Sequence, residues 1–280
     1  MNIASALTKA SEKLQAAGIA EPRREASSLL EFVLQQNSAY LIAHSDDQLA
    51  ANQKMIYDAC IKRRANREPL QYITGRCEFW RLEFEVTPDV LIPRPETEVL
   101  VEAAINFLSK IESPRFCEIG IGSGCIALSI LHSVKAATAI ATDVSASALQ
   151  IAARNAAKNG VGERLALRDG DLFGDIDEKF DLIVSNPPYI PDGEIENLQP
   201  EVRRFEPRVA LAGGEDGLDA IRRIAADSRQ FLNSRGVLLL EIGFDQAARV
   251  AKLFEVDDWE DVRFLHDLQN IDRVVKATLK

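Results

Sequence analysis

The sequence predicts an α/β protein in which a doubly wound, mostly parallel sheet of seven strands is preceded by a small helical bundle and a β-hairpin. Three observations lead to this prediction. The first seventy or so residues have the periodicity of helices, aromatic and alternating apolar residues come after them, and from Pro95 onward strand-like and helix-like segments alternate. Such alternation is typical of a parallel sheet with helices on both faces.

Residues 1–72 are expected to form the helical bundle. Apolar residues spaced i, i+4, i+7 and i+11 indicate a first helix, Gly18 is placed to end it, and Pro22 suits the first turn of a second. A third helix is expected from about residue 50 to 67, because Pro69 cannot continue it. Helices this short persist in water only when they pack together, so a bundle is expected.

Residues 73–92 are expected to form a β-hairpin linker, because residues 77–86 combine aromatic side chains with apolar alternation, and Pro88 and Pro93 stiffen the connection to the second domain. The second domain is expected over residues 93–280. Its candidate strands are residues 115–119, 138–142, 165–168, 180–185, 236–242, 262–266 and 273–279. Helices are expected between most of them, including residues 145–159, which Gly160 would end, and 218–232.

Composition and charge narrow the class of protein. Of the 280 residues, 46% are hydrophobic and 27% charged, and the net charge of −10 argues against non-specific binding to a nucleic acid backbone. The sequence has no signal-peptide pattern and no apolar run of about 18 residues, so a cytoplasmic protein without membrane association is expected. The cysteines and histidines are scattered, without Cys-x-x-Cys spacing, so no metal site is expected.

A glycine-rich turn comes after the first strand of the second domain. The segment Glu118-Ile119-Gly120-Ile121-Gly122-Ser123-Gly124 leads directly from an apolar strand into an apolar helix. Glycine permits positive φ and a close approach of a ligand to the backbone and the N-terminus of the next helix. The G-x-G-x-G spacing differs from the G-x-G-x-x-G of dinucleotide sites. It favours a nucleoside that carries a sulfonium and an amino acid, with a tight structural turn as the alternative.

Acidic residues stand after the next two strands. Asp143 ends the second strand about twenty residues after the glycine turn, where a carboxylate can accept hydrogen bonds from both ribose hydroxyls. Asp171 and Leu172 come after the third strand, where they are placed to meet an adenine amine and the adenine ring. Together with the glycine turn, Asp143 makes a nucleoside site the favoured interpretation.

The element Asn186-Pro187-Pro188-Tyr189 comes after the fourth strand. Its prolines stop the strand and hold Asn186 and the Pro187 carbonyl at the carboxyl edge of the sheet. These two oxygens can accept the two hydrogens of a planar NH2 group and so direct its lone pair at a methyl donor, while Tyr189 stacks on the acceptor. The element predicts methylation of a planar amide or amine nitrogen. A Pro-Pro turn that only ends a strand is the alternative.

These motifs together resemble the Rossmann-like amino-methyltransferases and, among them, the release factor glutamine methyltransferases. The closer resemblance is carried by Pro93-Arg94-Pro95-Glu96-Thr97-Glu98, Glu206-Pro207-Arg208-Val209-Ala210-Leu211, Gly213-Gly214-x-Asp216-Gly217 and Leu240-Glu241-Ile242-Gly243. It spans essentially the whole chain. It implies a Rossmann-like methyltransferase sheet and transfer of a methyl group from S-adenosylmethionine to N5 of the glutamine in the Gly-Gly-Gln motif of peptide chain release factors.

The resemblance also implies roles for single residues. S-adenosylmethionine would contact Gly120, Ile121, Gly122, Ser123, Gly124, Asp143, Leu172 and Asn186, with the acids Glu118 and Asp171 added beside them. Catalysis would fall to Asn186, Pro187 and Tyr189, and these would bind the glutamine with Pro188, Arg94 and Glu96. A bulky aromatic sometimes stands at the position of Leu172, so this chain loses ring stacking on adenine there. For Arg94 and Glu96, a structural salt bridge is the alternative.

Three other functions stay open at this point. The acceptor could be a glutamine of a ribosomal protein, or an adenine N6 of a nucleic acid, although the chain has no obvious basic stretch and no room for a large recognition insert. A regulator that binds S-adenosylmethionine without catalysis would not need the acceptor element. We expect a monomer whose partners are release factors and that binds no specific nucleic acid. The helical bundle is expected to help dock the protein substrate, with a stabilising role as the alternative.

Overall fold

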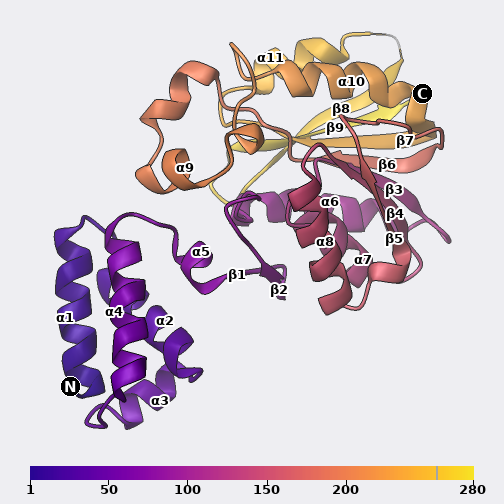
Figure 1. The fold of residues 1–280 in the computed structure, drawn as a ribbon. Coiled ribbons are helices and arrows are strands. Elements are labelled where there is room, and N and C mark those ends of the chain that lie inside the picture. The colour runs from indigo at the N-terminus through magenta and orange to yellow at the C-terminus, as the bar shows by residue number, and fades with distance from the viewer. Residues whose placement is uncertain (257) are drawn as a thin grey trace. The chain divides into compact units, whose positions relative to one another are not determined.

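The computed structural model describes residues 1–256 and 258–280 and forms two compact units (Figure 1). The first unit is Met1–Arg76 together with Gln199–Phe205, and the second is Cys77–Leu198 with Glu206–Lys280. The chain therefore crosses between the units three times, whereas the sequence indicated one crossing through a linker. Within the described ranges, no helix has the length and apolar character needed to span a membrane.

Short amphipathic helices form the first unit. They are α1 (Ile3–Ala16), α2 (Pro22–Leu34), α3 (Ser38–Ala43), α4 (Ala51–Ala65) and α5 (Leu70–Thr74). The Asn2 side chain caps α1, and Pro22 occupies the first turn of α2. Leu14, Leu29 and Leu30 are completely buried between the helices, and each such burial contributes about 1.5–3 kcal/mol. The sequence pattern predicted α1, α2 and α4 but not the short α3 and α5.

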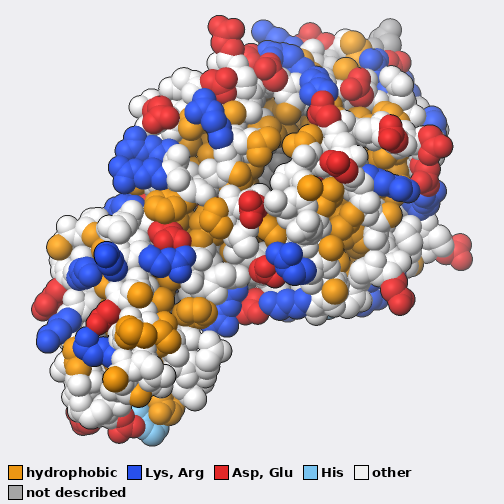
Figure 2. Space-filling model, in the orientation of Figure 1, with side chains coloured by type: hydrophobic (Ala, Val, Ile, Leu, Met, Phe, Trp, Pro, Cys, Tyr) orange, Lys and Arg blue, Asp and Glu red, His pale blue; other side chains and the backbone are white. Residues whose placement is uncertain are grey.

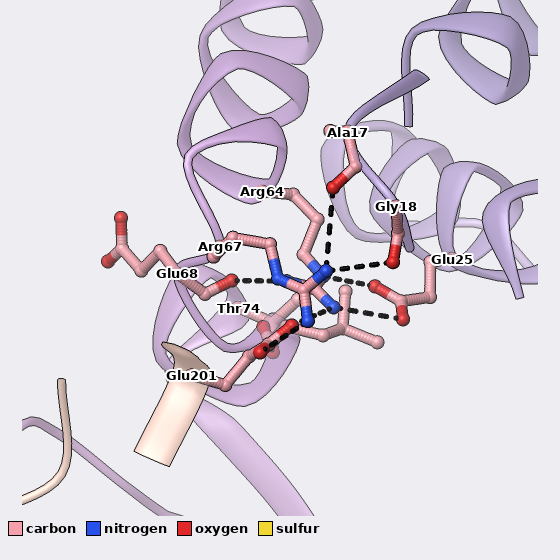
Figure 3. A network of polar contacts seen from close by, with 9 residues as sticks. Ala17, Gly18, Glu25, Arg64, Arg67, Glu68, Thr74 and Glu201 are labelled. Carbon is pink, nitrogen blue, oxygen red and sulfur yellow. Dashed lines mark hydrogen bonds and ion pairs between the residues drawn. The ribbon is translucent and has the colours of Figure 1, made fainter. Parts of the chain in front are cut away.

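Helix α9 (Pro200–Phe205) belongs to the first unit although it lies far along the chain. Figure 3 shows how it is held: Glu201 Oε1 accepts a hydrogen bond from Arg64 at 3.0 Å, and Glu201 Oε2 accepts one from Arg67 at 2.8 Å. Arg64 is buried and also pairs with Glu25 of α2. Removing one member of a buried ion-pair network leaves charge uncompensated, so Glu201 anchors α9 to the helical unit.

The hairpin consists of β1 (Arg76–Phe79) and β2 (Leu82–Glu85), which form a two-stranded sheet as predicted. Apart from Arg76, its residues belong to the second unit, where Phe79 and Phe84 enter the hydrophobic core. Asn155 of α8 (Ala146–Lys158) accepts a hydrogen bond from the Glu85 backbone at 2.7 Å and donates one to the Ser123 carbonyl at 2.8 Å. The hairpin is thereby connected to the glycine turn.

A seven-stranded sheet of order β5-β4-β3-β6-β7-β9-β8 forms the centre of the second unit. Its strands are β3 (Arg115–Ile119), β4 (Thr138–Asp143), β5 (Leu165–Asp169), β6 (Phe180–Ser185), β7 (Leu232–Glu241), β8 (Trp259–His266) and β9 (Asp272–Leu279). Strands β3 to β7 pair in parallel, and β9 pairs antiparallel with β7 and β8. The prediction of a mostly parallel, doubly wound sheet is confirmed.

Helices cover both faces of this sheet (Figure 1). Helices α6 (Glu98–Leu108), α7 (Cys125–Ser133) and α8 share one hydrophobic cluster with the sheet, and α10 (Asp219–Phe231) and α11 (Ala247–Ala251) share the other. Side chains alternate between the faces, so Phe116 of β3 lies in the first cluster and Cys117 in the second. The connections include short 3-10 helices at Pro95–Thr97, Gly162–Arg164, Asp192–Asn197, Arg208–Ala210 and Lys252–Phe254.

Charged side chains of both signs are interspersed on the faces drawn in Figure 2. The large hydrophobic side chains that are exposed include Ile42 and Met55 in the first unit and Val144, Val209 and Phe244 in the second. Val144 and Val209 line a cavity in the second unit.

Candidate active site

The cavity has a volume of about 380 Å³ and lies at the carboxyl edge of the sheet. It is lined by the segments that come after β3, β4, β5 and β6, together with the loop before α6 and the first turns of α10. The strand order reverses between β3 and β6, and doubly wound folds bind ligands at that point. The volume is within the usual range for small-molecule sites.

The glycine turn forms one wall of the cavity. Gly120, Gly122 and Gly124 all have positive φ, at 73°, 54° and 84°, a conformation in which a Cβ is strained. The backbone N–H groups of Gly120 and Ile121 both donate to the Thr142 carbonyl at 2.9 Å, so the turn is tied to the end of β4. Residues 120–123 line the cavity, whereas Gly124, outside the lining, caps α7.

Glu118 lies beneath this turn, at the end of β3. It is almost completely buried, lines the cavity and accepts a hydrogen bond from the Ala127 backbone at 2.8 Å, in the first turn of α7. Burial raises the pKa of this carboxyl well above its usual value, and the charge of Asp143 raises it further. The group therefore positions the start of α7 and presents a polar atom at the cavity wall.

Asp143 stands at the end of β4 and also lines the cavity. Its Oδ2 accepts a hydrogen bond from the Gly122 backbone at 2.9 Å, and its Oδ1 accepts one from the Ser145 backbone at 2.9 Å. An ionised carboxylate has about four acceptor sites, so each oxygen keeps capacity for a ligand hydroxyl. The backbone bonds fix the carboxylate in a position suited to a ribose diol.

Asp171 and Leu172 line the same cavity after β5. Asp171 forms an ion pair with Arg223 of α10 at 2.6 Å and is more than half exposed, so any adenine contact would share the carboxylate with that arginine. Leu172 has a φ of 52°, unusual for a residue with a side chain, and its carbonyl accepts a hydrogen bond from the Thr142 hydroxyl. The structure brings both predicted residues to the cavity.

The acceptor element begins directly after β6. Asn186, Pro187 and Pro188 line the cavity. The Asn186 side chain donates from Nδ2 to the Thr97 hydroxyl at 3.2 Å, and Thr97 is buried. With its nitrogen engaged in this way, the amide has its oxygen left as the acceptor for a ligand.

Tyr189, in contrast, is not among the described residues that line the cavity. Its hydroxyl donates to Glu241 Oε1 at 3.4 Å, at the end of β7, and its ring packs against the cluster beneath α10. Burial and then the nearby charge of Glu241 raise the pKa of the Tyr189 hydroxyl. In this arrangement Tyr189 anchors the element, and stacking on a bound acceptor would require the ring to reach the cavity.

A second glycine-rich segment, residues 213–217, packs closely against the backbone of the acceptor element. A Cβ on Gly213 would come within 2.9 Å of the Pro188 carbonyl, and one on Gly217 within 2.4 Å of the Tyr189 carbonyl. The adjacent backbones pair: the Gly213 N–H donates to the Ile190 carbonyl at 2.8 Å. Gly213 and Gly217 of the Gly-Gly-x-Asp-Gly motif are thus explained by the close approach of two backbones, whereas a Cβ on Gly214 would meet the Asp219 side chain.

Arg94 lines the cavity and donates to Glu206 Oε1 at 2.5 Å. The Glu206 side chain is almost fully buried, and burial raises its pKa against the lowering effect of Arg94. Glu96 is outside the described cavity lining. The resemblance placed both Arg94 and Glu96 in the pocket wall, and the structure brings only Arg94 there.

Some residues of the site had no role assigned from the sequence. Thr97 and Glu241 belong to segments that carried the family resemblance, but the sequence assigned neither of them a role of its own. In the structure Thr97 bonds to Asn186 and Glu241 bonds to Tyr189. Arg223 had no local signal at all, because its contact with Asp171 depends on the packing of α10. Glu241 could have been identified from the sequence, because it is a polar residue at the end of a buried strand.

The lining residues fit S-adenosylmethionine. The open backbone of the glycine turn, the free acceptor capacity of Asp143 and the apolar atoms of Val144 and Leu172 match, in order, a sulfonium-bearing amino acid, a ribose and an adenine. The Asp143 carboxylate also supplies negative charge that suits a cationic sulfonium.

Comparison with known proteins agrees with this geometry. The PrmC N-terminal domain family matches residues 5–75, and the methyltransferase small domain family matches residues 97–200. A release factor glutamine methyltransferase of Cereibacter sphaeroides is 44% identical over 281 residues, which cover 100% of this chain and 99% of that protein. A protein of the same name from Koribacter versatilis is 39% identical and is covered to 98%, as is this chain.

Among solved structures, the hMettl16 catalytic domain in complex with MAT2A 3'UTR hairpin 6 aligns with a TM-score of 0.59. The alignment covers 87% of this chain and 92% of that chain at 16% identity. This likeness concerns the fold alone, and with the matching family models it confirms the Rossmann-like methyltransferase sheet.

Proposed function

We propose that this chain, which belongs to the release factor glutamine methyltransferase family, transfers a methyl group from S-adenosylmethionine to N5 of the glutamine in the Gly-Gly-Gln motif of peptide chain release factors. The observation that carries the proposal is the orientation of Asn186 at the cavity. Its nitrogen is occupied by Thr97, and its oxygen is left to accept from an NH2 group. The relatives from Cereibacter sphaeroides and Koribacter versatilis supply the identity of the acceptor.

The chemistry required of the protein is mainly positioning. An amide nitrogen is a poor nucleophile because its lone pair is delocalised into the carbonyl. Asn186 Oδ1 and the Pro187 carbonyl accept its two hydrogens, which favours a tetrahedral nitrogen with the lone pair directed at the donor. S-adenosylmethionine, when bound, supplies an electrophilic methyl group on its sulfonium. The product nitrogen releases its proton readily, so no strong base in the cavity is needed.

The donor is held by the other side of the cavity. Residues 120–123 would hold its amino acid and sulfonium, Asp143 would accept from its ribose, and Leu172 would cover its adenine. Asp171 would be shared between the adenine and Arg223. Glu118 holds the first turn of α7 through its hydrogen bond with the Ala127 backbone. Arg94 is part of the cavity wall and is held by its ion pair with the buried Glu206.

The helical unit, whose residues 5–75 match the PrmC N-terminal domain family, is proposed to help dock the release factor. We expect the enzyme to act as a monomer in the cytoplasm, where release factors function.

The proposal is tested by incubating the protein with S-adenosylmethionine labelled in its methyl group. Four acceptors are offered separately: purified release factor, its Gly-Gly-Gln glutamine-to-alanine variant, ribosomes and DNA. Label on the release factor, lost in the variant, is the expected result. Label on ribosomes or DNA, with none on the release factor, would show a different acceptor, and no label on any of them would refute methyl transfer to these classes.

A further inference from the structure

A buried amide side chain connects the acceptor element to two other loops of the second unit. Gln246 stands immediately before α11 and is 1% exposed. Its Nε2 donates to the Tyr189 carbonyl at 2.9 Å and to the Gly217 carbonyl at 3.2 Å, and its Oε1 accepts from the Gly243 backbone at 2.8 Å. The acceptor element, the second glycine-rich segment and the loop after β7 are thus held by one side chain.

The contacts of this amide allow only one orientation. A primary amide has two N–H hydrogens to donate and an oxygen that accepts. Here both hydrogens meet carbonyls, and the oxygen meets an N–H group. A reversed amide would place its oxygen against the Tyr189 and Gly217 carbonyls, and buried polar groups without partners are costly. The Gln246 side chain is therefore fixed, and the backbones that it contacts are fixed with it.

The acceptor element has few backbone donors of its own. Its two prolines have no N–H group, so they cannot donate to a neighbouring segment. The element is held at its start by the hydrogen bond from Asn186 to Thr97, and at its end by the hydrogen bond from Gln246 to the Tyr189 carbonyl. The Pro187 carbonyl, which the proposed chemistry needs as an acceptor, lies between these two attachments in the chain.

We propose that Gln246 is a positioning residue for methyl transfer, which acts through the Tyr189 carbonyl to hold the Pro187 carbonyl where it accepts a hydrogen from the glutamine NH2 group. This role rests on the proposed function. Gly217 supports it, because a Cβ there would come within 2.8 Å of Gln246 Nε2 and within 2.4 Å of the Tyr189 carbonyl. The absence of a side chain at Gly217 leaves the room through which the amide reaches the acceptor element.

The first test compares Gln246→Met with Gln246→Glu. Methionine keeps the length of the side chain and loses all three hydrogen bonds, whereas an ionised glutamate still accepts from Gly243 but has no hydrogen to donate. With saturating donor and release factor, both variants should lower kcat by about tenfold to a hundredfold, because a misplacement of about 1 Å has an effect of that size. A role confined to the turn at Gly243 would instead leave Gln246→Glu with the natural kcat.

Two controls accompany this comparison. Affinity for S-adenosylmethionine, measured by calorimetry, should be unchanged in both variants, because the glycine turn and Asp143, which would hold the donor, belong to other segments. Gln53→Met removes a hydrogen bond from the Ala50 backbone in α4 and should keep the natural kcat. Thermal melting shows whether each variant is folded, and Gln246→Glu decides alone if Gln246→Met does not fold.

The second test follows kcat as the pH is lowered. Protonation gives the introduced glutamate one hydrogen to donate, so kcat of Gln246→Glu relative to the natural protein should rise toward acidic pH. The same ratio for Gln246→Met should stay constant, since methionine does not titrate.

Several results would overturn the positioning role. They are a natural kcat in Gln246→Met, a natural kcat in Gln246→Glu at alkaline pH, and a ratio for Gln246→Glu that stays as constant as that for Gln246→Met. A fall in donor affinity as large as the fall in kcat, or loss of the melting transition in both variants, would also do so, because either would show a structural role alone. Absence of any label on release factor by the unaltered enzyme would instead refute the proposed function, so the two failures are distinguishable.

Discussion

The contact between α9 and the helical unit can be tested with a single substitution, Glu201→Gln. The bond from Arg64 joins side chains that are 7% and 15% exposed, so its loss should cost about 1.5–3 kcal/mol, as for hydrogen bonds to charged groups. The bond from Arg67 involves a side chain that is 24% exposed, and solvent screening reduces its share to about 0.2–1 kcal/mol. Arg64 keeps Glu25, so its charge stays paired. The free energy of unfolding of the helical unit should therefore fall by about 2–4 kcal/mol.

Urea unfolding monitored by two probes separates the units. Both tryptophans, Trp80 and Trp259, belong to the second unit, so their fluorescence reports on that unit alone, while far-UV circular dichroism reports on all helices. With a urea dependence of about 1–3 kcal/mol per molar, the dichroism transition of the helical unit should move down by roughly 1 M or more, with the fluorescence transition nearly unchanged. Glu21→Gln, on the exposed pair with Arg24, is the matched control. Equal shifts for the two variants would refute the reasoning.

Three further substitutions test the cavity. Asn186→Ala should leave affinity for S-adenosylmethionine within about tenfold and lower turnover by orders of magnitude, since it removes an interaction made in the transition state. Calorimetry measures the affinity and single-turnover kinetics measure the methyl transfer. Normal turnover would contradict the mechanism. Asp143→Asn should weaken donor binding by about tenfold to a hundredfold, because an amide cannot accept both the Gly122 and Ser145 N–H groups; unaltered affinity in calorimetry would count against a ribose contact. Gly217→Ala should reduce turnover and stability, because its Cβ would lie 2.4 Å from the Tyr189 carbonyl at a φ of 78°. Gly193→Ala, with open space around it, should behave as the natural protein in melting and turnover assays.

The sheet could be predicted from the sequence because its signals are local. Each strand of the second unit is an apolar run bounded by turn residues, and the carboxyl ends of parallel strands meet at one edge, so Asp143 and Asn186 could be placed together without coordinates. The positive φ angles at Gly120, Gly122 and Gly124 agree with the same local reasoning.

The features that sequence reasoning missed depend on contacts between distant segments. Glu201 has no neighbour in sequence that marks it as a partner of Arg64, and Arg223 reaches Asp171 only because α10 packs over the sheet. Tyr189 was expected to face the acceptor from the chemistry of its ring. Its hydroxyl instead finds the buried Glu241, an acceptor that a local pattern does not show. The sequence therefore predicted the helices and strands more completely than it predicted the contacts of individual side chains.

The placement of α9 also has a consequence for synthesis on the ribosome. Arg64 and Glu201 are 137 residues apart, and at about 5–20 residues per second the ribosome needs roughly 7–27 s to add that length of chain. During this delay α1 to α5 can collapse, and of the two acidic partners that Arg64 has among the described residues, Glu25 is present and Glu201 is not yet made. The nascent helical unit therefore stays incomplete until most of the second unit has left the exit tunnel. The last step in its folding is the docking of α9, which is synthesised long after α1 to α5.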